Sequence, residues 1–496
     1  MTPSSNYQQL ESLFSDLTDL NHLQSLAHWD EAAMMPIGGG AARAQSLATL
    51  SAIKHQKLIQ PSVDQLIQEA KQDTQLSAWQ QRNLFLMERQ YQNATCLPVE
   101  LVKKIAEQST LCEQAWRELR PKNDWKNFYP KLENLFQLVR QSAEIRADIF
   151  KMAPYDVLLD EFSPGVSQAL IDPIFAKLSS VLPDLIKKII AHQADNKPMP
   201  LQGPFDADAQ RELALVAMKH IGFDFDRGRL DTSHHPFCGG FRNDSRITTH
   251  YHADDFLKAF FAVCHETGHA CYEQHLPEQW MSQPVGLAYG MAIHESQSLI
   301  IEMPTCRSQE FMQFIHPHFQ QLMGDQKALS LDNLTKLIRQ VDNSFIRVFA
   351  DEATYPLHVI LRYEIERDLF NDNVNMKELP DLWHAKMQHY FNLSTDGNYT
   401  DGVMQDVHWP AGIFGYFPAY TLGRLIAQQF HHSALQAHPD IPGALAKGDF
   451  SPLMNWLKTN VHEKASRLTM DALLTEATGE TLNPDYFIRH LKETYL

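Results

Sequence analysis

The sequence is poor in cysteine, and its cysteines form no recognisable pattern. Six are spread over 496 residues, and no two of them form a CxxC motif. They are Cys96, Cys112, Cys238, Cys264, Cys271 and Cys306. A secreted disulfide scaffold is therefore excluded, and reduced thiols in a cytoplasmic protein are expected. Cys264 and Cys271 are seven residues apart in a segment expected to be helical, and we interpret them as core residues.

Long apolar runs and an excess of positive charge are also missing. No stretch approaches the eighteen or so apolar residues that a membrane-spanning helix needs. The N-terminal MTPSSNYQQLESLF has no basic start followed by an apolar run, so no signal peptide is expected. The formal net charge of −17 argues against nucleic-acid binding, which depends on clustered Lys and Arg. We expect a soluble cytoplasmic protein with neither membrane nor nucleic-acid partners.

Helical periodicity dominates the rest of the chain. Residues 7–28 place Leu10, Leu13, Phe14, Leu17 and Leu20 at the three- and four-residue spacings of one apolar helical face. Similar patterns occur at 81–93, 99–117, 130–152, 174–192, 209–220, 331–350, 420–431 and 484–494. The sequence therefore predicts a mostly α-helical protein. A chain of this length could hold two or three ordinary domains or a single helical body, and the pattern places an N-terminal helical hairpin region at about 1–75.

Only one segment has a convincing strand pattern. Residues 246–252 (RITTHYH) are short, rich in β-branched residues and preceded by a turn-prone stretch. This pattern predicts a small β-sheet beside the helix that follows. If the segment were a lone edge strand, it could pair with an extended peptide.

A metal-binding motif lies in the next segment. Asp254 or Asp255 can cap a helix expected from about 255 to 275, which carries the sequence HETGH. His265 and His269 would lie one turn apart on one face and could share a zinc ion. Glu266, next to the first histidine, would reach a zinc-bound water and act as general base.

Two histidines leave a catalytic zinc short of one protein ligand. Glu295 follows His269 by 26 residues, an interval that allows a loop and an antiparallel return helix. It is flanked by Ile293 and Leu299 and not by a run of charge, so a carboxylate at this position needs a partner. Glu302, seven residues further on, is the competing choice for the third ligand.

The sequence resembles the carboxypeptidase Taq family of zinc metallocarboxypeptidases. Besides HETGH, the resemblance rests on HPF (235–237), DSRIT (244–248), HESQ (294–297), IRVFAD (346–351) and GVMQDVHW (402–409). The segments HWDEAAMMPIGGGAARAQSLATL near the N-terminus and GYFPAYTLG (415–423) also match, so the resemblance spans nearly the whole chain.

The resemblance implies a single catalytic domain over 1–496, with a large helical body and a long central substrate groove similar to those of angiotensin-converting enzyme and neurolysin. The N-terminal hairpin is expected to cover part of this groove. The resemblance also implies zinc, with cobalt as a possible substitute, held by His265, His269 and Glu295, and Glu266 as the base. The implied activity is broad-specificity removal of single C-terminal residues from short or unfolded peptides. An oligoendopeptidase using the same groove is the alternative. Family members tend to be homodimers.

Further site residues follow from the chemistry and the resemblance together. A tetrahedral intermediate needs hydrogen-bond donors, for which His408, Tyr416 and Tyr420 are candidates. Arg347 is suited to bind the substrate's C-terminal carboxylate, unless it pairs with an acid of the chain. Other residues expected to contact substrate or brace the groove are Arg246, His235 and Gln405. Asp351 and Asp406 are expected to orient the ligating imidazoles.

Overall fold

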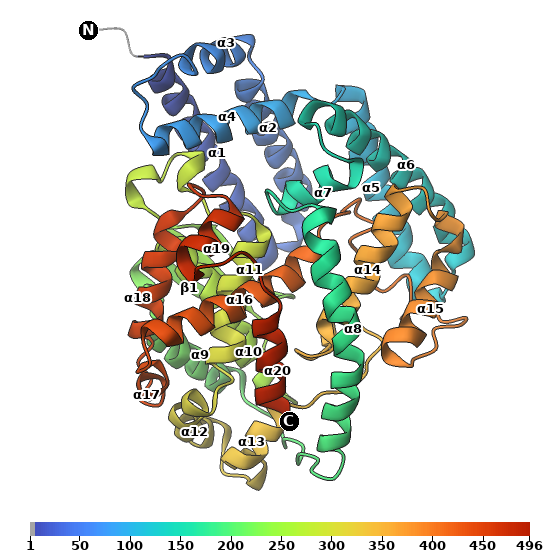
Figure 1. The fold of residues 1–496 in the computed structure, drawn as a ribbon, viewed down its shortest axis with the longest axis vertical. Coiled ribbons are helices and arrows are strands. Elements are labelled where there is room, and N and C mark those ends of the chain that lie inside the picture. The colour runs from blue at the N-terminus through green and yellow to red at the C-terminus, as the bar shows by residue number, and fades with distance from the viewer. Residues whose placement is uncertain (1–4) are drawn as a thin grey trace.

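The computed structural model describes residues 5–496, and its regular structure is almost entirely helical (Figure 1). The helices are α1 (Asn6–Ala33), α2 (Gly40–Leu58), α3 (Pro61–Ala70), α4 (Ala78–Thr95), α5 (Val99–Leu119), α6 (Trp125–Phe150), α7 (Pro154–Phe162), α8 (Gln168–Gln193), α9 (Ala207–Ile221), α10 (Phe256–Gln274), α11 (Met291–Ile300), α12 (Gln309–Met323), α13 (Leu331–Ile338), α14 (Tyr355–Phe370), α15 (Leu379–Phe391), α16 (Pro418–Ala437), α17 (Ile441–Leu445), α18 (Ser451–Asn460), α19 (Met470–Thr478) and α20 (Asp485–Tyr495). The predicted fold class is confirmed. Within residues 5–496, none of these helices combines the length and apolarity needed to cross a bilayer.

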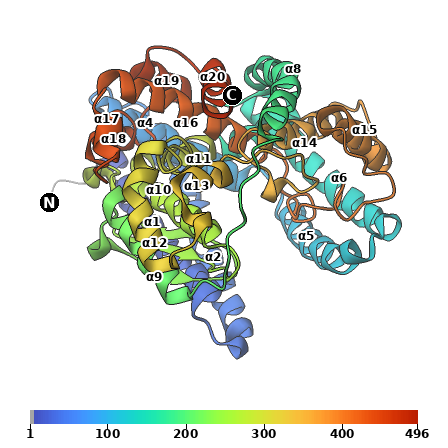
Figure 2. The same ribbon diagram turned by 90° about the horizontal axis from the view of Figure 1, so that it is seen from below.

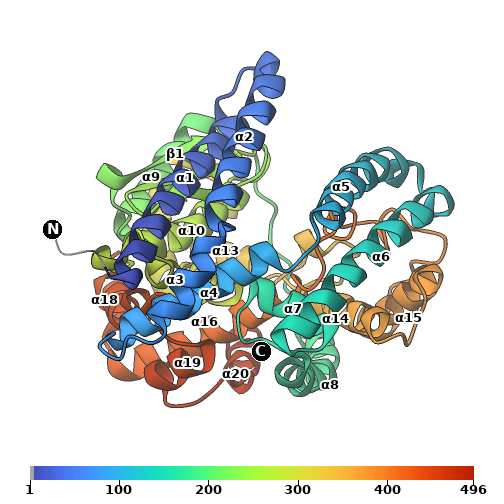
Figure 3. The same ribbon diagram turned by 90° about the horizontal axis from the view of Figure 1, so that it is seen from above.

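The helices gather in two groups. Figures 2 and 3 show α5, α6, α8, α14 and α15 on one side and α9, α10, α12, α13, α18 and α19 on the other. One large apolar core runs through both groups. Residues of α1, α3 and α4 form a second, smaller core, so the N-terminal unit extends past residue 75 into α4. That this unit covers a groove stays a prediction.

The predicted sheet is present, but the predicted strand is its centre and not an edge. Strands β1 (Gly228–Thr232), β2 (Phe237–Phe241) and β3 (Asp244–Thr249) lie in the order β1-β3-β2. β3 pairs in parallel with β1 and antiparallel with β2. Both sides of β3 are therefore occupied, and the idea that this strand receives a peptide is wrong. β1 and β2 were missed because glycine and polar residues weaken their strand pattern.

One predicted helix is shorter than its apolar pattern. The segment 331–350 forms α13 only as far as Ile338, and a 3₁₀ turn over Arg347–Phe349 follows after a loop. In that loop the Val341 backbone N–H donates to the Gln193 side chain, and the Asp342 backbone N–H donates to the Asp351 side chain. Polar side chains thus satisfy the backbone groups that a longer helix would have paired.

Helix α11 is wedged between α10 and α16, and glycines permit the close approach on both sides. A Cβ on Gly268 of α10 would lie 2.5 Å from the Gln297 carbonyl oxygen of α11. A Cβ on Gly423 of α16 would lie 2.8 Å from Cγ of Glu295. Any larger residue at either position would push α11 away. The second variable position of HETGH is therefore a packing residue.

Candidate metal centre

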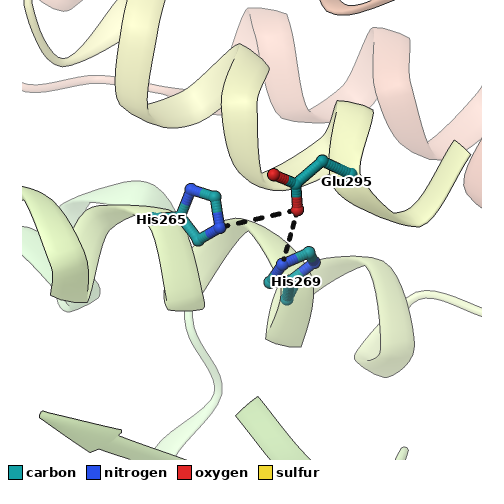
Figure 4. Close-up of side chains that lie close together, drawn as sticks. All are labelled: His265, His269 and Glu295. Atoms are coloured by element: carbon teal, nitrogen blue, oxygen red, sulfur yellow. Dashed lines mark ion pairs between the residues drawn. The ribbon is translucent and has the colours of Figure 1, made fainter. Parts of the chain in front are cut away.

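Helices α10 and α11 bring the three predicted ligands together. Asp255 caps α10 by accepting from the Leu257 backbone N–H, and the helix covers the predicted span within a residue. Oε2 of Glu295 lies 3.7 Å from Nε2 of His265 and 3.4 Å from Nε2 of His269 (Figure 4). In residues 5–496 this is the one group of three or more such side chains whose ligand atoms converge within 4.8 Å. The donor set of two imidazoles and a carboxylate suits zinc.

The outward nitrogen of His265 is held by Glu302. Nδ1 of His265 lies 3.0 Å from Oε2 of Glu302, and Arg307 donates to the other carboxylate oxygen at 2.7 Å. Glu302 lies in a π-helical turn, Ile301–Thr305, that contains Pro304. The proline cannot donate within the helix, and the widened turn carries Glu302 to the imidazole. Glu302 thus lies on the outer side of His265 and outside the group of converging ligand atoms.

The outward nitrogen of His269 is held by a second histidine. Nδ1 of His269 lies 2.7 Å from Nδ1 of His294, whose Nε2 lies 3.0 Å from Glu273. The chain is satisfied when His269 donates to His294 and His294 donates to Glu273. In that arrangement Nε2 of His269 carries no proton and is free to bind a metal. Both histidines of HETGH therefore point the correct nitrogen at Glu295.

Charges around the centre favour a divalent cation. Burial by itself would raise the pKa of Glu302, but Arg307 and His265 lower it to about 2. The pKa of Glu295 is also lowered, because the two histidines outweigh its burial. Burial would lower the pKa of His265, yet Glu295 and Glu302 raise it to about 9, whereas burial lowers that of His269 to about 4. Both carboxylates are therefore ionised near neutral pH, and they stabilise positive charge at His265, where a bound metal would replace the proton.

Glu266 lies beside the ligands in a largely dry environment. Its side chain is buried, and burial raises its pKa to about 7 against the opposing pull of His265. A carboxylate with this pKa can both accept and return a proton near neutral pH. His265, Glu266 and Glu302 line a cavity of about 680 Å³ with the ends of α10 and α13. The predicted base therefore faces open space next to the ligands.

The two aspartates expected to orient the imidazoles do something else. Asp351 accepts from the backbone N–H groups of Ala353 and Thr354 and so fixes the turn that leads into α14. Asp406 forms ion pairs with Arg347 and Arg362. Their orienting role is performed by Glu302 and by the His294 and Glu273 pair. The prediction for Asp351 and Asp406 was wrong because Glu302 and His294 already contact the outer nitrogens of the two imidazoles.

Arg347 pairs with an acid of the chain, the alternative that the sequence left open. Its guanidinium donates to Asp406 at 2.9 Å and to the Tyr355 hydroxyl at 2.6 Å. Arg362, which is fully buried, donates to the second oxygen of Asp406 at 2.6 Å. Burial would raise the pKa of Asp406, but the two guanidiniums hold it well below its usual range. Two buried cations thus share one carboxylate, leaving one positive charge unneutralised.

Replacing Asp406 should strongly destabilise the protein. Asp406→Asn leaves two buried guanidiniums facing each other without a counter-charge, so we expect the free energy of unfolding to fall by about 3–5 kcal/mol. Urea denaturation followed by circular dichroism measures this change. Asp332→Asn is the control, because its ion pair with Lys336 is exposed and should contribute little. Equal effects of the two substitutions would contradict the buried-charge argument.

The three predicted oxyanion donors lie together at the start of α16. The Tyr420 hydroxyl lies 3.5 Å from Nε2 of His408, and the ring centres of Tyr416 and Tyr420 are 5.2 Å apart. Nδ1 of His408 is buried without a hydrogen-bond partner. Burial lowers the pKa of His408 to about 4, so its imidazole is neutral near pH 7. Burial and the charge of Glu295 raise the pKa of both tyrosines, so they remain donors.

The remaining predicted residues brace the structure or lie at its surface. Arg246 pairs with Asp244 at 2.6 Å, and its guanidinium lies 4.5 Å from the ring centre of Trp29, joining the sheet to α1. The Gln405 amide accepts from the Arg347 backbone N–H and donates to two carbonyls. Its influence on substrate would therefore act through Arg347. His235 is exposed.

Sequence reasoning missed several of these partners. Glu273 lies four residues after His269, on the same helical face, and Glu302 lies two turns after Glu295. That spacing is a signal for acids beside the ligands, although it does not say what they contact. Arg362 gave no signal, because a single arginine is ordinarily solvated and the sequence does not show that all sides of its helix are buried.

Known proteins match this chain over its whole length. Residues 9–495 match the family described as carboxypeptidase Taq (M32) metallopeptidase. Carboxypeptidase 1 of Bacillus subtilis is 35% identical, over 97% of this chain and 96% of its own. Thermostable carboxypeptidase 1 of Thermus thermophilus is 33% identical, over 100% and 99%. The structure of Trypanosoma cruzi metallocarboxypeptidase 1 superposes with a TM-score of 0.97 at 39% identity, covering 99% of both chains.

The family match and the converging ligand atoms agree with each other, and they agree with the motifs of the sequence. A family of metallopeptidases requires a divalent metal, and the donor set of His265, His269 and Glu295 meets that requirement. This chain belongs to the carboxypeptidase Taq (M32) family and is a metallocarboxypeptidase.

Proposed function

We propose that the chain is a zinc-dependent carboxypeptidase that removes single residues from the C-terminus of short or unfolded peptides with broad specificity. The observation that carries this proposal is the convergence of two Nε2 atoms and one carboxylate oxygen, with both Nδ1 atoms satisfied on the outer side. Such an arrangement holds the ligands ready for a metal. A cytoplasmic location and a homodimer stay predictions from the resemblance.

His265, His269 and Glu295 would hold the zinc. When bound, zinc would supply a Lewis acid that polarises the scissile carbonyl and makes a water more acidic. Glu266 accepts the proton of the attacking water and returns it to the leaving amine nitrogen. Its raised pKa suits both steps, because the carboxylate form accepts and the acid form donates.

The growing negative charge on the carbonyl oxygen needs donors placed in advance. His408, Tyr416 and Tyr420 supply them in the proposal. His408 and Tyr416 lie in the stretch that leads into α16, Tyr420 lies in its first turn, and Gly423 of the same helix contacts Glu295. The same helix contact that positions a metal ligand therefore fixes the distance between the proposed donors and the metal.

Recognition of the substrate's terminal carboxylate is proposed for the Arg347 region. Arg347 and Arg362 share Asp406, and this trio carries a net positive charge. A substrate carboxylate near Arg347 would complete the charge balance. Arg347 is only 5% exposed. The substrate carboxylate would therefore contact only the edge of the guanidinium, or the positive charge of the guanidinium would attract the carboxylate across a short gap.

A peptide-ladder assay tests this function. A purified peptide is incubated with zinc-loaded or cobalt-loaded protein, and the masses of the products are measured by mass spectrometry. Successive losses of single C-terminal residues are expected, and internal fragments would indicate an oligoendopeptidase instead. The same peptide with a C-terminal amide should be cleaved at background level, because it offers no carboxylate to the buried arginines. An N-acetylated peptide is the control and should be shortened normally. Unchanged cleavage of the amide would refute carboxylate recognition.

A further inference from the structure

Glu366 is a fully buried carboxylate that the proposed chemistry does not use. It lies in α14, and its side chain is 0% exposed. Arg362, one turn before it, is already paired with Asp406. Burial raises the pKa of Glu366 to about 7, although its hydrogen bonds pull the other way. A carboxylate kept in the core without a cation of its own needs a structural reason.

Three donors surround this carboxylate, and two of them belong to the same loop. The indole N–H of Trp409 donates to one oxygen at 2.6 Å. The backbone N–H of Gly415 and the hydroxyl of Tyr155 donate to the other, each at 2.8 Å. Glu366 therefore ties together two points of the chain that lie six residues apart and joins them to α7.

The two loop donors are direct neighbours of proposed oxyanion donors. Trp409 follows His408, and Gly415 precedes Tyr416. Gly415 has a φ of 85°, and a Cβ there would lie 2.7 Å from the Leu158 carbonyl carbon of α7. Only glycine fits this approach, so its N–H is held in place from both sides. The chain is thus fixed at Trp409 and at Gly415 by hydrogen bonds to one carboxylate, that of Glu366.

We propose that Glu366 is a positioning residue that clamps the 406–417 loop, so that His408 and Tyr416 are aimed at the carbonyl oxygen of the substrate. This inference rests on the proposed function, because it assumes that the two side chains stabilise the oxyanion. Arg362 holds the start of the same loop through Asp406. One face of α14 therefore sets the loop at three points: Asp406, Trp409 and Gly415.

The test is Glu366→Gln. A glutamine has one acceptor oxygen where the carboxylate has two, and its amide N–H₂ must face either the indole N–H or the Gly415 N–H. One of the two hydrogen bonds between the loop and residue 366 is then lost. We expect kcat to fall at least about tenfold, part of the effect of deleting an oxyanion donor. KM and metal content should stay within about twofold of wild type, because a group acting only on the transition state changes kcat alone.

A matched control lies on the same helix. Glu364 accepts from Tyr390 and Lys386 on the face of α14 that meets α15, away from the loop. Glu364→Gln removes a similar set of hydrogen bonds and should leave kcat unchanged. If Glu366→Gln fails to fold, Trp409→Phe deletes one donor and keeps the carboxylate, and its kcat should fall with KM constant. Combining the two substitutions should lower kcat by less than the product of the single effects.

The outcomes separate the clamp from the function on which it rests. A low kcat in His408→Ala beside normal kcat in Glu366→Gln and Trp409→Phe removes the clamp and leaves the proposed function standing. Normal kcat in His408→Ala and Tyr416→Phe removes the oxyanion assignment, and the clamp with it. If the fall in kcat/KM of Glu366→Gln is fully explained by lost metal, the proposal is also overturned, since that result would show a general loss of structure.

Discussion

Glu266→Gln should lower kcat by at least about two orders of magnitude while zinc binding stays at wild-type stoichiometry. The amide keeps the size and most of the hydrogen bonding of the side chain, but it cannot accept the proton of the attacking water. Glu266 is not among the three converging ligands, so the ion should be retained. Steady-state kinetics on a synthetic peptide, with metal content measured by mass spectrometry, gives both quantities.

The effect must be separated from a general loss of carboxylate charge. Glu212→Gln changes an exposed glutamate of α9, the helix packed against α10, and should leave both kcat and metal content unchanged. Normal turnover in Glu266→Gln would remove this residue from the mechanism. Lost metal in that variant would instead show that Glu266 helps to hold the ion.

Glu295→Gln should weaken zinc binding by more than about 100-fold, which is more than the loss of a group that only contacts a metal ligand. A neutral amide oxygen replaces the one anionic ligand, and both histidines lose the carboxylate that their Nε2 atoms face. Competition with a chelator of known affinity measures the change. Activity at limiting zinc should fall with the occupancy of the site, and excess zinc should restore part of it.

The loss of zinc affinity in Glu302→Gln should be smaller than the loss in Glu295→Gln. This side chain contacts the outer nitrogen of His265, and losing such a partner typically costs 10- to 100-fold in metal affinity. The order of the two effects therefore distinguishes the two carboxylates that the sequence offered as the third ligand. A larger loss in Glu302→Gln than in Glu295→Gln would reverse the assignment and show that Glu302 binds the ion.

The metal centre was predictable because its chemistry is local in the sequence. His265, Glu266 and His269 depend only on helical spacing, and the apolar surroundings of Glu295 indicated a carboxylate with a partner. The helices around them follow from three- and four-residue periodicity. The family motifs then selected Glu295 from its competitor, since spacing alone left Glu302 open.

What the sequence missed depends on contacts between distant segments. Asp406 looked like a partner for a ligating imidazole, but Arg362 and Arg347 reach it first from two other elements. Glu366 gave no sign of its role, because both loop residues that it binds lie more than forty positions away. The sheet was expected from β3 alone, and its neighbours could be identified only once the chain had folded back on it.

The wedge of α11 between Gly268 and Gly423 has a consequence for anyone redesigning this enzyme. The main chain of α10 rests on the main chain of α11 at Gly268, and the main chain of α16 rests on the side-chain stem of Glu295 at Gly423, so a substitution at either glycine would shift the carboxylate relative to the imidazoles. Altered substrate preference can be sought in the loops, where side chains can adjust. Altered metal preference through this helix would require moving three helices at once, so the coordination geometry is the least tunable property of the protein.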